Sequence, residues 1–196
     1  MLFIIIDRKI EMKFFITALI SLILLVSTSN DVRAENACAS YLDTSFNKLH
    51  SSEKVNLCEL TKGKPVLIVN TASNCGYTPH FKKLEAIHKK YEKDGLVVIG
   101  FPSNDFFQEE DDEAKTADVC FINYGVTFTM LATSAVSGSD VNSVFKYLNN
   151  KSSSPKWNFY KYLIDGKGNK VENFSPRVAP DDAEFTQAIE TLLAKN

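Results

Sequence analysis

The chain has 196 residues and a formal net charge of −2, from 22 basic and 24 acidic residues. This length is typical of one domain, and the near balance of charge excludes the strongly basic surface with which proteins bind nucleic acid. The longest block of like charge is the acidic run 109–113, which suits a loop and the first turn of a helix.

The N-terminal residues have the pattern of a secretory signal. A basic start is followed by the apolar stretch 14–26, and Val32 and Ala34 are small residues placed for signal peptidase. The apolar stretch is shorter than the roughly 20 residues that a membrane span needs. We therefore expect residues 1–34 to be cleaved and residues 35–196 to form a single domain, exported to the periplasm or secreted. An uncleaved membrane anchor is the alternative.

A strand–helix–strand unit forms the predicted centre of this domain. The apolar run 65–69 is too short for a helix and rich in β-branched residues, so it predicts a buried strand over 66–71. Apolar residues at helical spacing predict a helix that begins near Pro79 and ends at Gly95. A second buried strand is expected at 96–101. Short links in this order imply parallel strands.

The remaining elements complete an α/β domain. In chain order we predict a hairpin over 42–60, a helix over 111–124, a strand over 128–132, a helix over 141–150, a hairpin of strands 160–164 and 170–174, and a final helix opened by Pro180. This order is typical of a thioredoxin-like fold. It has a central mixed sheet flanked by helices, with an N-terminal β-hairpin and an inserted helix.

Cys75 lies at the turn between the first central strand and the first helix. Unpaired backbone N–H groups and the helix dipole stabilise negative charge at such a position, so a thiolate is favoured there. The thiolate is the nucleophilic form of cysteine. A buried, inert cysteine is the alternative interpretation.

Three motifs resemble those of glutathione peroxidases in their cysteine form. They are Asn-Thr-Ala-Ser-Asn-Cys-Gly-Tyr-Thr at 70–78, Gly-Phe-Pro-Ser-Asn at 100–104 and Lys-Trp-Asn-Phe at 156–159. The resemblance runs from about residue 42 to the C-terminus. It implies a peroxidase with a thioredoxin-like fold that reduces hydrogen peroxide and small organic hydroperoxides. It implies no metal, haem or flavin cofactor.

The resemblance implies a catalytic tetrad of Cys75, Gln108, Trp157 and Asn158. Amide and indole N–H groups are neutral donors that can stabilise a thiolate and orient a peroxide. From composition alone, the tryptophan would be a core residue and the two amides loop or turn residues. The loop before Gln108 is one residue shorter than is usual in the family. It carries Asp105 where a glutamine is usual, and a carboxylate beside the sulfur would disfavour the thiolate.

Cys120 resembles the resolving cysteine of the thioredoxin-dependent branch. The resemblance implies that a sulfenic acid at Cys75 condenses with Cys120 to a disulfide, which a thioredoxin-like protein or glutathione then reduces. Because the two cysteines lie in separate predicted elements, we expect the Cys120 helix to unwind locally. A buried helix cysteine is the alternative.

The segment 136–157 is short. The resemblance associates a longer insertion at this place with tetrameric members that use glutathione. Its absence favours a monomer or small oligomer, and a thioredoxin-like protein over glutathione as the reductant.

Cys38 and Cys58 lie outside the peroxidatic chemistry. An even number of cysteines in an exported chain permits disulfides, although spacing does not choose among the three pairings of four cysteines. We expect a structural Cys38–Cys58 disulfide, with two free thiols as the alternative. His50, His80 and His88 lack the spacing of metal ligands, so no metal site is expected.

Taken together, the motifs predict a thiol peroxidase that acts on a hydroperoxide, without nucleic-acid binding or stable membrane association after cleavage. One alternative is a redox sensor or relay that passes oxidation to a client protein. Another is a binding domain on the same scaffold. A peroxiredoxin is disfavoured because the proline and threonine that precede its cysteine are missing before Cys75.

Overall fold

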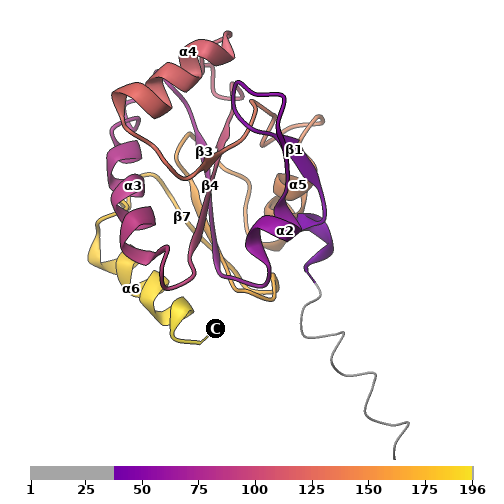
Figure 1. Cartoon of the computed structure of the whole chain (residues 1–196), viewed down its shortest axis with the longest axis vertical. Coiled ribbons are helices and arrows are strands. Elements are labelled where there is room, and N and C mark those ends of the chain that lie inside the picture. The colour runs from indigo at the N-terminus through magenta and orange to yellow at the C-terminus, as the bar shows by residue number, and fades with distance from the viewer. Residues whose placement is uncertain (1–37, 196) are drawn as a thin grey trace, which may run out of the picture. The chain divides into compact units, whose positions relative to one another are not determined.

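A five-stranded mixed sheet organises residues 38–195, the part of the chain that the computed structural model describes (Figure 1). The strand order is β5-β4-β3-β6-β7. The central strand β3 (Val66–Thr71) pairs in parallel with β4 (Val97–Pro102), which pairs in parallel with β5 (Thr129–Met130). On the other side, β6 (Lys161–Ile164) and β7 (Val171–Phe174) complete an antiparallel half. The predicted mixed sheet is confirmed. The predicted signal segment lies outside the described residues.

Helices cover both faces of this sheet (Figure 1). On one face lie α3 (His80–Tyr91) and α6 (Ala183–Leu193), and on the other lie α2 (Leu57–Thr61) and α5 (Ser143–Lys151). Asn56 caps α2 by accepting a hydrogen bond from the backbone of the first turn. Within residues 38–195, none of the helices is both long and apolar enough to cross a membrane.

Side chains that alternate along β3 divide the core in two. Leu67 and Val69 pack with residues of α3 and α6, whereas Val66 and Ile68 pack with residues of α2 and α5. All six residues of β3 are buried. A strand covered on both faces explains why the sequence shows an apolar run here rather than an alternating pattern.

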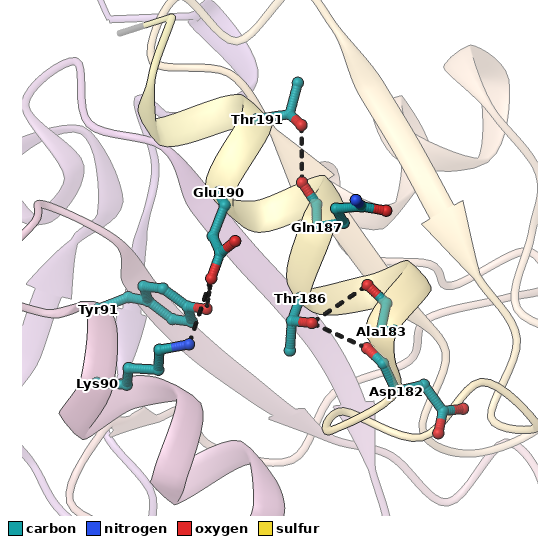
Figure 2. A network of polar contacts seen from close by, with 8 residues as sticks. All are labelled: Lys90, Tyr91, Asp182, Ala183, Thr186, Gln187, Glu190 and Thr191. Carbon is teal, nitrogen blue, oxygen red and sulfur yellow. Dashed lines mark hydrogen bonds and ion pairs between the residues drawn. The ribbon is translucent and has the colours of Figure 1, made fainter.

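Polar contacts tie α6 to the helix that follows Cys75 (Figure 2). The Tyr91 hydroxyl donates a hydrogen bond of 2.7 Å to Glu190, and the Lys90 ammonium lies 3.3 Å from the same carboxylate. Beneath these contacts, Phe185 and Ile189 of α6 are buried in the core that α3 covers. The two helices therefore pack as one layer on this face.

Two predicted elements differ in detail. The hairpin is formed by β1 (Ser45–Asn47) and β2 (Lys54–Asn56), and the residues after Asn56 turn into α2 instead of extending the second strand. The predicted helix over 111–124 is α4 (Glu113–Ala117) followed by a π-helix, η2 (Asp118–Asn123). In η2 the wider turn keeps Cys120 buried while the two side chains after it are exposed.

Candidate active site

The loop between β3 and α3 places Cys75 at the carboxyl end of the central strand. Cys75 is 7% exposed. The Thr78 hydroxyl accepts a hydrogen bond of 3.0 Å from the Cys75 N–H and donates one of 3.0 Å to the Ala72 carbonyl. One side chain therefore closes the loop and aims the cysteine. The sequence analysis missed this role of Thr78, although its place in the first motif is a signal that could have found it.

The Cys75 sulfur accepts a hydrogen bond from the backbone N–H of Tyr77, with 3.4 Å between nitrogen and sulfur. A backbone donor favours the anionic form of the group that accepts from it. The start of α3 at His80 adds the positive end of a helix dipole to the same region. The surroundings of the sulfur therefore include a backbone donor and the start of a helix.

Gln108 and Asn158 meet although they are 50 residues apart in the sequence. The Asn158 side-chain amide donates a 3.0 Å hydrogen bond to the Gln108 side-chain oxygen. The Gln108 carbonyl accepts a 2.8 Å hydrogen bond from the Asn74 N–H, next to Cys75. Asn158 is buried, and its own side-chain oxygen has no partner among the described residues.

In the shortened loop before Gln108, the side chain of Asp105 is hydrogen-bonded to residues 136–137. Asp105 accepts hydrogen bonds from the Val136 N–H at 2.8 Å, and from the N–H and hydroxyl of Ser137 at 2.7 and 2.9 Å. Phe107 adopts the left-handed region at φ +58° and is 92% exposed. This strained residue lets the chain turn so that Gln108, rather than Asp105, reaches Asn158.

Trp157 is 42% exposed, so it is not the core residue that composition alone favours. Its ring packs against Phe106 with 5.7 Å between ring centroids. Its carbonyl accepts a 3.1 Å hydrogen bond from the side chain of Asn70, at the end of β3. Within residues 38–195, none of the tetrad side chains donates a hydrogen bond to the Cys75 sulfur. Their placement depends instead on the Gln108–Asn158 side-chain pair and on the hydrogen bond that Asn70 donates to the Trp157 carbonyl.

Cys120 is fully buried in η2 and belongs to the same apolar cluster as Cys75. Burial, with a smaller effect from the charge of Glu109, raises the pKa of the Cys120 thiol to about 12. Glu109 is itself buried. It accepts hydrogen bonds from the N–H and hydroxyl of Ser73 and, at 3.1 Å, from the hydroxyl of Thr116. It thereby links the Cys75 loop to α4.

Cys38 and Cys58 are half-buried thiols that lie side by side. Burial, followed by the hydrogen bond and charge of Cys58, raises the pKa of Cys38 to about 12. The structure thus brings together the two cysteines that we expected to pair, and it describes both in the reduced form.

The fold and this loop define a thioredoxin-like domain with a cysteine-based site at the end of its central strand. Residues 42–149 match the glutathione peroxidase family. Glutathione peroxidase-like peroxiredoxin 2 of Saccharomyces cerevisiae is 40% identical over 164 residues, which cover 79% of this chain and 100% of that protein. A glutathione peroxidase of Lactococcus lactis subsp. cremoris is 40% identical over 129 residues, covering 63% of this chain and 82% of that protein.

A solved structure shows the same likeness in three dimensions. The crystal structure of T. cruzi GPX1 matches with a TM-score of 0.59 and 27% identity, covering 80% of this chain and 97% of that one. The chain therefore belongs to the glutathione peroxidase family, and it is a glutathione peroxidase-like peroxidase. The family resemblance and the thioredoxin-like fold are both confirmed.

The hydroxyl of Thr78 provides a test of how the Cys75 loop is held. Thr78→Val leaves the buried Cys75 N–H and Ala72 carbonyl without this partner, so we expect it to lower the free energy of unfolding by about 1–3 kcal/mol. Thr78→Ser keeps the hydroxyl and should lose only about 0.8 kcal/mol, the value of one methyl group. Chemical denaturation followed by circular dichroism measures both. A loss in Thr78→Val no larger than that in Thr78→Ser would show that the hydroxyl contributes little and would contradict the assignment.

Proposed function

We propose that the chain reduces hydrogen peroxide and small organic hydroperoxides through Cys75. The observation that carries this proposal is the nearly buried sulfur that accepts the Tyr77 N–H at the end of β3. The Cys75 thiolate attacks one oxygen of the hydroperoxide and the O–O bond breaks. The other oxygen leaves, takes up a proton, and becomes water or an alcohol. The cysteine is oxidised to a sulfenic acid by two electrons.

Gln108, Trp157 and Asn158 are proposed to position the hydroperoxide and stabilise the leaving oxygen. Their N–H groups are neutral donors, so they perform this role without a change of ionisation. The Asn158 side-chain oxygen, buried without a partner among the described residues, is available to accept a hydrogen bond from a hydroperoxide O–H. The amide pair formed by Gln108 and Asn158 supports a shared role.

Cys120 is proposed to resolve the sulfenic acid. Its thiol condenses with the oxidised Cys75, so that an S–S bond forms and water leaves. Because Cys120 is fully buried and its pKa is raised to about 12, it reacts only after η2 opens. Two observations support opening. π-helical turns are frequent at functional sites, and the neighbouring Phe121 and Ile122 are 41% and 74% exposed, so they contribute little to the core.

A thioredoxin-like protein, or glutathione, is proposed to reduce the Cys75–Cys120 disulfide by thiol–disulfide exchange. The reductant's thiols are oxidised to a disulfide as the two cysteines regain their protons. The segment 136–157 contains one helix, α5, which packs on the core. This short connection supports the proposal of a monomer or small oligomer, with a thioredoxin-like reductant preferred over glutathione.

We also propose that the chain is exported and that Cys38 and Cys58 form a structural disulfide. The side-by-side thiols support the pairing. In an oxidising compartment such a bond resists reduction, whereas the cytosol keeps most thiols reduced. The bond would join the segment before η1 (Ser40–Leu42) to α2.

Single substitutions of the two catalytic cysteines separate the proposed steps. Cys75→Ser should abolish peroxide reduction, because it removes the nucleophile. Cys120→Ser should keep the wild-type rate of the first oxidation but lose turnover with a thioredoxin-like reductant. Stopped-flow measurement of peroxide-dependent oxidation, followed by mass spectrometry of cysteine linkages, checks both. Full turnover by Cys120→Ser would show that another group resolves the sulfenic acid. Slow turnover with every small reductant, but fast transfer to one client protein, would favour a redox relay.

Substitutions of Gln108 test whether neutral hydrogen-bond donors assist the oxidation of Cys75. We expect Gln108→Ala to slow Cys75 oxidation by about 100-fold, the typical effect of removing one such donor. Gln108→Glu should slow it further, because a carboxylate opposes both the thiolate and the leaving oxygen. Gln187→Ala, at an exposed position on α6, is the matched control. If Gln108→Glu reacts as fast as the wild type, a role for this side chain as a hydrogen-bond donor is excluded.

The proposed structural disulfide is tested by the exported protein itself. Non-reducing peptide mapping should recover a peptide pair that joins Cys38 to Cys58. Each of Cys38→Ser and Cys58→Ser should lower the free energy of unfolding by about 3 kcal/mol, because either one opens the same loop. The double variant should lose no more than either single one. Additive losses would indicate two independent thiols.

A further inference from the structure

Lys161 is a fully buried lysine in β6 that the proposed mechanism does not use. Its ammonium donates hydrogen bonds to the Phe159 carbonyl at 3.2 Å and to the Ser175 carbonyl at 3.0 Å. It lies 5.7 Å from the centroid of the Phe185 ring. Among the described residues, no carboxylate lies within ion-pair distance of this ammonium. Its donors are therefore directed at main-chain carbonyls.

Phe159, whose carbonyl accepts the hydrogen bond from Lys161, directly follows Trp157 and Asn158 in the chain. Its φ of +64° lies in the left-handed region, which is unfavourable for a residue with a bulky side chain. A strained residue persists only where its surroundings hold it. The Phe159 N–H donates a 2.7 Å hydrogen bond to the Asn70 carbonyl, and its own carbonyl accepts from Lys161. Both backbone groups of the strained residue are thus held.

Burying a charge is unfavourable, and a methionine would fill a similar space without that penalty. The ammonium, by contrast, supplies several donors from one point. Here two of its contacts join the Phe159 turn to the residue that follows β7. An apolar side chain at this position would therefore lack the hydrogen bonds that make this connection.

We propose that Lys161 is a positioning residue for the peroxidase reaction: its ammonium holds the left-handed turn at Phe159 and thereby sets where Trp157 and Asn158 lie. This inference rests on the proposed function for its kinetic consequence. Its structural consequence, the placement of the turn, is independent of that function. The ring of Phe159 also packs against His80, whose ring contacts Tyr77, the donor to the Cys75 sulfur.

The charged groups around Lys161 come from α3 and from the residues just before α6. Asp182 precedes α6 and acts to raise its pKa, while the larger effect of burial lowers that pKa to about 8. Burial, with help from Lys161 and Lys83, lowers the pKa of His80 on α3 to about 4. Lys83 is paired with Asp181 at 2.7 Å. The range from pH 6.5 to 9.5 lies above the pKa of His80 and spans that of Lys161, so His80 stays neutral there while Lys161 loses its proton.

The experiment compares Lys161→Met, Lys161→Arg and the control Lys156→Met, which removes an exposed charge next to Trp157. Trp157 is the single tryptophan of the chain, so its fluorescence reports on the turn directly. Lys161→Met should shift the emission and slow peroxide-dependent oxidation of Cys75 by about tenfold, since small misplacements of positioning groups have effects of this size or larger. Lys161→Arg, which keeps charge and donors, should retain most of the rate. Lys156→Met should change neither readout.

If folded Lys161→Met shows unchanged Trp157 emission and an unchanged rate of Cys75 oxidation, the proposal is overturned, even when the variant is less stable than the wild type. If Lys161→Met does not fold, the emission of Cys75→Ser is followed from pH 6.5 to 9.5. The proposal is supported if the Trp157 emission of Cys75→Ser changes with a midpoint near pH 8 and if this change is absent in the double variant Cys75→Ser, Lys161→Arg. An emission that does not vary with pH overturns the proposal. If the wild type fails to react with hydroperoxides, the proposed function falls, whereas the emission of Lys161→Met still tests the placement of the turn.

Discussion

The hydrogen bonds of Asn70 are the interaction on which the site depends. This buried residue at the end of β3 accepts from the Phe159 N–H with its carbonyl, accepts from the Tyr160 N–H with its side-chain oxygen, and donates to the Trp157 carbonyl with its side-chain amide. A buried amide without such partners is costly. Satisfying it requires the turn that carries Trp157 and Asn158 to lie beside the strand that leads to Cys75.

The two cysteines of the proposed cycle occupy opposite environments within one apolar cluster. Cys75 is on a loop whose backbone donates to its sulfur, whereas Cys120 is enclosed in a helix where burial opposes its ionisation. The proposed first step thus needs little rearrangement, and the proposed second step needs the π-helical segment to open. Glu109 accepts hydrogen bonds from Ser73 in the Cys75 loop and from Thr116 in α4, the helix that leads into η2, so it links the segments that carry the two cysteines.

The site also depends on where its charges are placed. Asp105 is bound by three donors at residues 136–137, so its carboxylate is satisfied away from the Gln108–Asn158 pair. The buried ammonium of Lys161 is directed at the carbonyls that shape the turn. The groups left for the proposed chemistry are neutral amides, which can stabilise developing negative charge without a change in their own ionisation.

Much of the fold followed from local patterns. The apolar run at β3 and the helical spacing of Phe81, Leu84 and Ile87 each require burial on a defined face, so their element types were predictable. The residues after Asn56 were not, because the cap that this side chain makes in α2 outweighs the strand tendency of the sequence. Likewise, helical spacing does not distinguish the π-helix η2 from an α-helix.

For the site, the sequence by itself determined the family and the residue types: a cysteine before a helix, two amides, an indole and a second cysteine. Only the tertiary structure decided that Gln108 rather than Asp105 meets Asn158, that Thr78 closes the Cys75 loop, and that Lys161 supports the Phe159 turn. The physical reason is that these are hydrogen bonds with strict distance and direction, and the Gln108–Asn158 bond joins residues 50 apart in the chain. Such contacts leave no periodic signal in the sequence, because they form only after the two apolar cores have placed the strands and loops.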